Sequence, residues 1–296
     1  MKKGRLWRHL QYEVFLLPAL LTFTAFTVIP LLKTLLYSFT DFDGILHTYN
    51  FVGFKNYASV FRDDVMKQAL FNTLFYTFFS VLLINTISIP LAVCLDKNTR
   101  VKTLQRAIFF FPSVISALLL GYIWTYILSP LKSGALNSIL ISVFGIPKPI
   151  GFTSGGWIAK FSIIAVAVWA NTGWHTMVNI AYLQAIDPTY YEAASIDGAS
   201  KLDQFRFITV PLLAPALTVN TLLLLTNGLK VYDLPYALTK GGPGYSNYTV
   251  TQIIIQRGIS ERQYGVSTAL AAIFILLVMV IAVIQYTTMS KREVEA

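Results

Sequence analysis

Residues 192–200 read EAASIDGAS, and this small-residue, mildly acidic stretch lies between two long apolar runs. The chain around it has 296 residues, of which 55% are hydrophobic and only 12% are charged. An average soluble domain has about 25% charged residues. Apolar runs of about 20 residues, long enough to cross a bilayer, recur along nearly the whole chain. The sequence therefore predicts an all-α polytopic membrane protein with a single transmembrane domain over residues 1–296.

Six apolar windows have the length of a transmembrane helix, so both termini are expected on the same side of the membrane. Basic residues are concentrated in residues 1–8, in the short connector at 97–106 and at 291–292. Connectors rich in Lys and Arg tend to face the cytosol. We therefore expect cytosolic termini and a cytosolic connector around EAASIDGAS. The predicted spans are at about residues 14–37, 71–95, 107–128, 158–184, 209–231 and 265–288.

Few residues suggest chemistry within the chain itself. The formal charge of +9 comes largely from residues that border apolar spans, where lipid headgroups and membrane topology explain them better than nucleic acid does. His9, His47 and His175 are scattered and lack metal-ligand spacing. No motif of the type GxxxxGK[ST] or HExxH occurs. We expect no catalysis, no metal and no cofactor in this chain, so any ATP would be bound by a partner.

The central parts of the predicted spans hold neutral polar and aromatic side chains but no Asp or Glu, which disfavours an ion-coupled carrier. Ser and Asn can pair with sugar hydroxyls without burying a charge, and Trp or Tyr can cover the apolar face of a sugar ring. The alternative for each residue is helix–helix packing, which uses the same residue types in membranes. The candidate substrate-binding residues are Ser113, Ser116, Asn171, Trp174, Asn220, Asn227 and Tyr232.

Local signals around EAASIDGAS predict two short helices with a sharp turn between them. Asp187 is placed to cap the first helix, and Gly198 to end it in a left-handed conformation. Ser200 is placed to cap the second helix, with Asp203 in a capping-box relation to it. The pair offers a low-relief surface with two acidic groups to a cytosolic partner. An ordinary interfacial loop is the alternative.

The pattern EAAxxDGA, followed by VPLLAP at residues 210–215, resembles the EAA loop of binding-protein-dependent ABC importer permeases. Further segments resemble the carbohydrate-uptake branch of these permeases, the maltose and glycerol-phosphate type. They are VGFKNY at 52–57, NT at 72–73, FFFPSVIS at 109–116, WANTGWHTM at 169–177 and VYDLPYALTKGGPG at 231–244. The residues that match the EAA loop are Glu192, Ala193, Ala194, Asp197, Gly198, Ala199 and Pro211.

The resemblance implies the fold of a type I ABC importer permease in the cytoplasmic membrane of a bacterium or archaeon. It also implies a heterodimer with a second permease, two ATPase subunits that bind ATP and Mg, and an extracytoplasmic solute-binding protein. Residues 187–208 would form the coupling loop that docks on an ATPase subunit. The implied cargo is a sugar or sugar derivative, an oligosaccharide in particular. An ion-coupled secondary sugar transporter and a membrane enzyme remain as alternatives.

Overall fold

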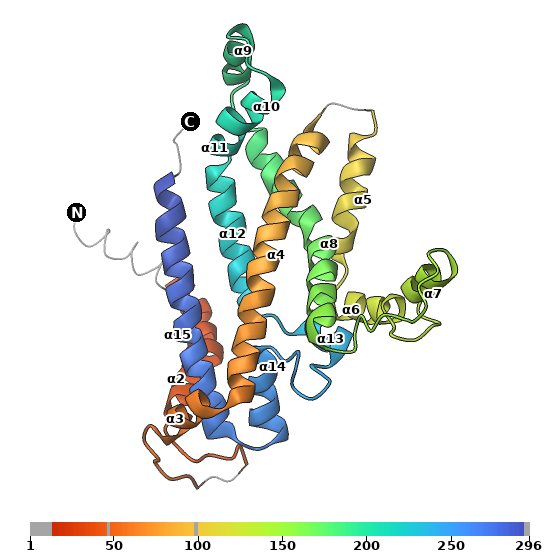
Figure 1. Cartoon of the computed structure of the whole chain (residues 1–296). Helices are drawn as coiled ribbons and strands as arrows, with labels where there is room; N and C mark the ends of the chain where they lie inside the picture. The colour runs from red at the N-terminus through yellow and green to blue at the C-terminus, as the bar shows by residue number, and fades with distance from the viewer. Residues whose placement is uncertain (1–13, 46–47, 98–99, 293–296) are drawn as a thin grey trace, which may run out of the picture. The chain divides into compact units, whose positions relative to one another are not determined.

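The computed structural model describes residues 14–45, 48–97 and 100–292 (Figure 1). Both ends of the chain, with His9, and also His47, lie outside these ranges. The described residues are mostly helical, and the β interaction recorded among them is an isolated antiparallel bridge between Thr40 and Phe51. The prediction of an all-α fold is confirmed. The chain divides into two compact units, Met1–Asp63 with Ile254–Ile275, and Asp64–Ile253 with Leu276–Ala296.

The first unit contains an apolar helix, Val14–Tyr37, with a π-helical stretch η1 (Thr24–Val28) before α2 (Ile29–Tyr37). Its large apolar side chains are exposed, with Phe15 at 84% and Phe26 at 81%, as expected for a surface that faces lipid. The unit continues with α3 (Lys55–Arg62), η3 (Gln256–Ser260) and the first part of α15 (Tyr264–Met289).

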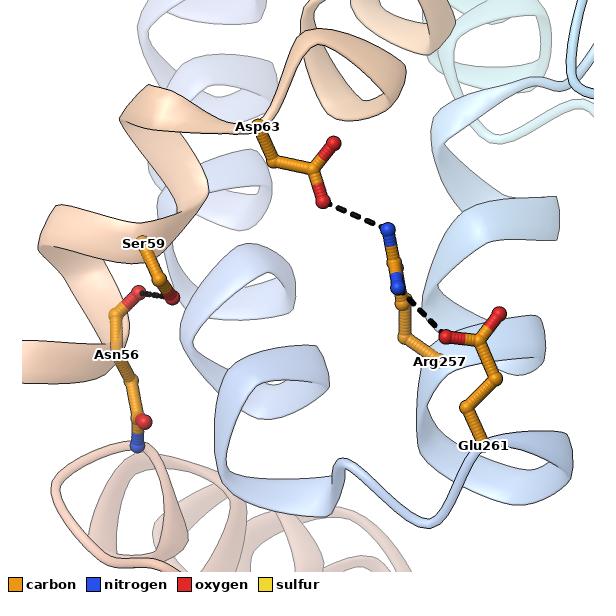
Figure 2. A network of polar contacts seen from close by, with 5 residues as sticks. All are labelled: Asn56, Ser59, Asp63, Arg257 and Glu261. Atoms are coloured by element: carbon orange, nitrogen blue, oxygen red, sulfur yellow. Dashed lines mark hydrogen bonds and ion pairs between the residues drawn. The ribbon is translucent and has the colours of Figure 1, made fainter.

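A polar network joins the end of α3 to η3 within this unit (Figure 2). The Arg257 guanidinium donates to Asp63 Oδ2 at 2.7 Å and to Glu261 Oε2 at 2.6 Å. Close by on α3, Ser59 Oγ donates to the carbonyl of Asn56 at 2.6 Å. The Arg257 side chain is only 18% exposed, so these charge-assisted bonds are partly shielded from solvent. They fix the loop that precedes α15.

The second unit contains most of the helices. Its long members are α4 (Asp64–Asp96), α8 (Gly156–Leu183) and α12 (Ala214–Leu229). The shorter ones are α5 (Lys102–Val114), α6 (Ala117–Ile127), α7 (Ala135–Ser142), α9 (Thr189–Ile196), α10 (Lys201–Gln204), η2 (Phe205–Thr209), α11 (Val210–Leu212), α13 (Asp233–Thr239) and most of α14 (Val250–Ile255). The end of α15 and η4 (Ser290–Arg292) complete it.

Helix α8 is the centre of this unit. Ile164 and Val168 on one face of α8 pack with Ile84 of α4 and Leu224 of α12. Another face packs against α6 and α13. Lipid tails are as apolar as these side chains, so close packing of the helices, more than exclusion of water, is the source of stability here. The buried residues of this second cluster are Leu120, Leu128, Ile163, Val166, Ala167, Ala170, Leu234 and Leu238.

Two of the predicted spans are broken in the structure. The window 107–128 is divided between α5 and α6, which bend by 96°. Ile115 and Ser116 have extended backbone at the break, and Ser116 Oγ accepts from the N–H of Leu119, which caps α6. The prediction of one continuous helix over this window is therefore wrong. The fifth window is similarly bent by 64° between Lys201–Leu212 and α12.

Length and composition single out three unbroken described helices as able to cross a membrane: Val14–Tyr37, α4 and α15. The number rises to five if each bent pair forms one span. Helix α8 covers the fourth predicted window with 28 residues, but it is not among the five. Its middle carries Asn171, Thr172 and His175, which lower its apolar character.

Candidate functional site

Helix α9 carries most of the EAASIDGAS stretch and is capped as its sequence predicts. Asp187 Oδ1 accepts from the backbone N–H of Thr189 at 2.9 Å, and this bond lowers the pKa of the exposed Asp187 carboxyl. At the other end Gly198 has φ +80°, and the N–H of Ala199 donates to the carbonyl of Ala194 at 2.9 Å. The predicted left-handed end at Gly198 is confirmed.

Helix α10 begins with a complete capping box. Ser200 Oγ accepts from the N–H of Asp203 at 3.2 Å, and Asp203 Oδ2 accepts from the N–H of Ser200 at 3.1 Å. Asp203 Oδ2 also accepts from the Ser200 hydroxyl, and this bond, more than the backbone one, lowers the pKa of the carboxyl. Gln204 Nε2 donates to Ser195 Oγ at 2.8 Å. Helices α9 and α10 are therefore tied to each other across the turn.

The surface of the α9–α10 pair combines acidic and apolar side chains. Glu192 and Asp197 are exposed, and so are Ile196, at 86%, and Leu202, at 73%. Ile196 and Leu202 were not among the predicted coupling residues, although two apolar side chains in an otherwise polar connector are a readable signal of a partner surface. Six of the seven matching residues lie on α9 or in the turn after it, whereas Pro211 lies in α11.

A cavity of about 420 Å³ opens in the second unit, and four predicted residues from separate segments line it. They are Ser113 of α5, Asn171 of α8, Asn227 of α12 and Tyr232, which precedes α13. Asn171 Nδ2 donates to the carbonyl of Ala167 at 2.8 Å, which leaves its Oδ1 without a partner among the described residues. The lining can thus offer neutral donors and acceptors and a phenol ring to a bound solute.

Three other predicted residues are outside this lining. Ser116 caps α6. Trp174 is 39% exposed, with its ring edge-to-face against His175 at 4.8 Å between centroids. Asn220 is fully buried and bonds to His175 and Asn179. For these three the structure supports capping or packing contacts.

The structure adds lining residues that sequence reasoning missed. Tyr76 and Ser80 come from α4, and His175 from α8; Lys230 and Asp233 also line the cavity and are exposed. Tyr76 with Ser80, like Asn171 with His175, are four residues apart and so share a helix face. Polar residues four apart within an apolar helix were the sequence signal that could have identified these lining residues. Among the described residues, no group of three or more His, Cys, Asp or Glu could hold a metal ion.

The Asn72–Thr73 pair holds the loop that follows α13. Asn72 Nδ2 donates to the carbonyls of Ser246 and Tyr248, both at 2.9 Å. Thr73 Oγ1 accepts from the N–H of Val250 at 2.9 Å. The NT pair therefore fixes residues 246–250, which lie just after the segment VYDLPYALTKGGPG.

Apolar helices around a polar cavity, with an exposed helix pair in the connector between two of the cavity's walls, define a membrane permease. The chain belongs to the family described as binding-protein-dependent transport system inner membrane component, whose model matches residues 84–293. Members are non-catalytic membrane subunits of transport systems. The prediction of a permease of a binding-protein-dependent ABC importer is confirmed.

Relatives with similar sequences match nearly end to end. The chain is 31% identical to the probable starch degradation products transport system permease protein AmyD of Thermoanaerobacterium thermosulfurigenes, over 99% of each chain. It is 29% identical to the multiple sugar-binding transport system permease protein MsmF of Streptococcus mutans, over 95% of each. It is also 29% identical to the trehalose/maltose transport system permease protein MalF of Thermococcus litoralis, over 90% of this chain and 89% of that one.

Solved structures share the fold. A chain of a bacterial ABC transporter involved in the import of the acidic polysaccharide alginate superposes with a TM-score of 0.84 at 21% identity, over 97% of this chain and 99% of that one. A second structure, of an alginate ABC transporter in complex with an alginate pentasaccharide-bound periplasmic protein, gives a TM-score of 0.83 at 21% identity, over 95% and 94%. The predicted type I importer permease fold is confirmed.

Proposed function

We propose that this chain imports a sugar, an oligosaccharide in particular, as one permease of a heterodimer. Two partner ATPase subunits bind ATP and Mg and drive the cycle, and an extracytoplasmic solute-binding protein delivers the cargo. The chain itself holds no cofactor. Both termini and the α9–α10 pair face the cytosol, in keeping with the distribution of Lys and Arg.

One observation carries the proposal: four neutral or aromatic residues chosen from the sequence as sugar contacts line the same cavity. They are Ser113, Asn171, Asn227 and Tyr232. The cavity volume of about 420 Å³ lies in the range of about 300–1,000 Å³ typical of ligand pockets. A polyhydroxyl solute needs many neutral hydrogen bonds and an aromatic contact. The relatives named for starch degradation products, multiple sugars and trehalose/maltose support the same class of cargo.

The connection between the helix pair and the cavity supports a mechanical role for residues 187–208. Helix α9 follows α8 after a short connector, and α10 leads through η2 and α11 into α12. Both α8 and α12 contribute to the cavity wall. A displacement of the α9–α10 pair by an ATPase subunit would therefore reach two walls of the cavity directly.

The function is tested by uptake of labelled malto-oligosaccharides, from maltose to maltotetraose, into proteoliposomes that contain the assembled transporter. We expect uptake that requires ATP, persists when an ionophore dissipates ion gradients, and accompanies co-purification of an ATPase subunit. Uptake that needs no ATP and stops with the ionophore would support the ion-coupled carrier instead.

The coupling role is tested at Gly198. A Cβ at Gly198 would meet no heavy atom within 4 Å, so a substitution acts through the backbone conformation alone. A left-handed backbone costs a residue other than glycine about 1–2 kcal/mol, which is a five- to thirtyfold change in population. Gly198→Val should lower ATP-dependent uptake by about that factor. Gly198→Asn is the matched control, because Asn adopts this conformation more readily, and equal uptake by both variants would contradict the coupling role.

A further inference from the structure

A chain of buried side-chain hydrogen bonds begins at the wall of the cavity. His175 Nδ1 lies 2.9 Å from Asn220 Oδ1, and Asn220 Nδ2 lies 2.8 Å from Asn179 Oδ1. Asn179 Nδ2 lies 3.1 Å from Ser88 Oγ. His175 is 5% exposed and the other three are fully buried, so α8, α12 and α4 are linked in a medium where each bond is strong.

The backbone carbonyl at one end of this hydrogen-bond network sets the direction of its bonds, and the Ser88 hydroxyl at the other end is compatible with that direction. At one end Asn220 Nδ2 also faces the backbone carbonyl of His175 at 3.4 Å, and a carbonyl can only accept. At the other end Ser88 Oγ donates to the carbonyl of Asn85 at 3.4 Å, so it is free to accept from Asn179. If the Asn220 amide were reversed, its oxygen would face that carbonyl oxygen. Asn220 Oδ1 therefore faces the imidazole.

This direction determines the tautomer of His175. Because Asn220 Oδ1 accepts, His175 Nδ1 must carry the proton. In the neutral ring the other nitrogen, Nε2, then carries no proton and can accept a hydrogen bond. His175 lines the cavity, and its Nε2 has no hydrogen-bond partner among the described residues.

We propose that His175 is a cargo-binding residue whose Nε2 accepts a hydrogen bond from a hydroxyl of the cargo. The chain Asn220–Asn179–Ser88 holds the ring and its tautomer in that state. The inference rests on the proposed function of the cavity. It makes the site selective for solutes that present a hydroxyl donor at this point, because an analogue without that hydroxyl would cover the acceptor of the 5% exposed His175 without pairing it.

Two substitutions separate the two nitrogens of His175. In His175→Asn the side-chain amide occupies roughly the place of Nδ1, so its N–H can still reach Asn220 while the Nε2 acceptor is lost. In His175→Gln the amide lies nearer the place of Nε2, so the acceptor is kept and the bond to Asn220 is lost. Thr86→Ala is the control outside the lining, because Thr86 Oγ1 donates within α4 to the carbonyl of Leu82 at 2.7 Å.

The experiment measures uptake by the assembled transporter of whichever malto-oligosaccharide the wild type takes up best. Loss of one neutral hydrogen bond should raise the KM about three- to tenfold in His175→Asn, with the melting temperature close to that of the wild type. His175→Gln should show the opposite pattern, a lowered melting temperature and a KM near that of the wild type. The ¹⁵N-histidine signals that are present in the wild-type spectrum and absent from that of His175→Asn belong to His175. These signals should show a protonated Nδ1 and an unprotonated Nε2.

The outcomes distinguish this inference from the proposed function. If the wild type takes up sugar and His175→Asn keeps its KM, or if the spectra show a protonated Nε2, His175 has only a structural role and the inference is wrong. If the wild type takes up none of the sugars although the assembled transporter hydrolyses ATP, the proposed cargo class fails, and the inference fails with it.

Discussion

At Gly173, α8 lies close to the backbone of α5, and this contact offers a sharp test of the helix arrangement. A Cβ at this position would lie 1.9 Å from the carbonyl oxygen of Phe109 and 3.0 Å from the Cα of Phe110. Ordinary contacts begin at 3.4 Å, so the methyl group of alanine is about 1.5 Å too close. The obstructing atoms belong to the backbone, which no rotamer change can move away. Helix α5 must shift or bend to admit even one methyl group.

The expected cost of Gly173→Ala follows from two opposing effects. Alanine improves the helix propensity of α8 by about 1 kcal/mol over glycine. Overpacking by one methyl group costs about 1–3 kcal/mol, and the contact with backbone atoms favours the upper end of that range. We expect a net loss of about 2 kcal/mol in the free energy of unfolding. Because Ser113 lies on α5 in the cavity wall, sugar uptake should fall as well.

The measurement is the thermal denaturation of the detergent-solubilised chain, with Gly228→Ala as the matched control. A Cβ at Gly228 would lie 3.0 Å from Thr77 Cγ2 and 3.1 Å from Thr77 Oγ1, both side-chain atoms that can move by a few tenths of an ångström. Gly228→Ala should therefore change stability by less than about 1 kcal/mol. A Gly173→Ala chain as stable as the wild type, or a larger loss in Gly228→Ala, would refute the close approach of α5 to α8.

Two further predictions concern the connectors. Because the pKa of Asp203 is lowered, its carboxylate stabilises the start of α10 fully at a pH above 3.8, the ordinary pKa of the group, and this stabilisation is lost as the pH falls through the lowered pKa. Ser200→Ala should raise the pKa of Asp203 toward 3.8. A ¹³C-carboxyl titration by NMR measures this pKa. Asn72→Ala leaves the carbonyls of Ser246 and Tyr248 without their donor, so we expect the free energy of unfolding to fall by about 2–4 kcal/mol and tryptic cleavage after Lys240 to become faster. Gln68→Ala keeps both of these bonds and should be cleaved at the wild-type rate.

The caps around EAASIDGAS could be predicted because they depend on neighbours in sequence. The capping box of Ser200 and Asp203 spans three residues, and the left-handed turn at Gly198 needs only a residue without a Cβ. The break between α5 and α6 was missed although Ser116 is a favoured cap residue, because residues 107–128 are otherwise largely apolar and Ser is also common inside membrane helices. Tertiary contacts that the sequence does not show then hold α6 against α13: a Cβ at Gly121 of α6 would lie only 2.5 Å from the Cβ of Ala237 on α13.

The choice of cavity residues depended on depth along the helices, which the sequence does not reveal. Asn220 and Asn227 are seven residues apart and so lie on nearly the same face of α12, two turns from each other. Asn227 lines the cavity, whereas Asn220 is buried and bonds to His175. Both were reasonable candidates for sugar contacts from residue type alone. Only the packing of α8 against α12 separates the residue in the lining from the residue behind it.

The buried chain behind the cavity also bears on how movement of the α9–α10 pair would reach the cargo. Ser88, Asn179, Asn220 and His175 connect α4, α8 and α12 at the level between the cavity and the connector. Sliding one of these helices along another would break bonds in a medium where no water can replace them. A displacement of the α9–α10 pair should therefore move α4, α8 and α12 together as one rigid body. The cavity then opens or closes while the hydrogen bonds behind its wall stay intact.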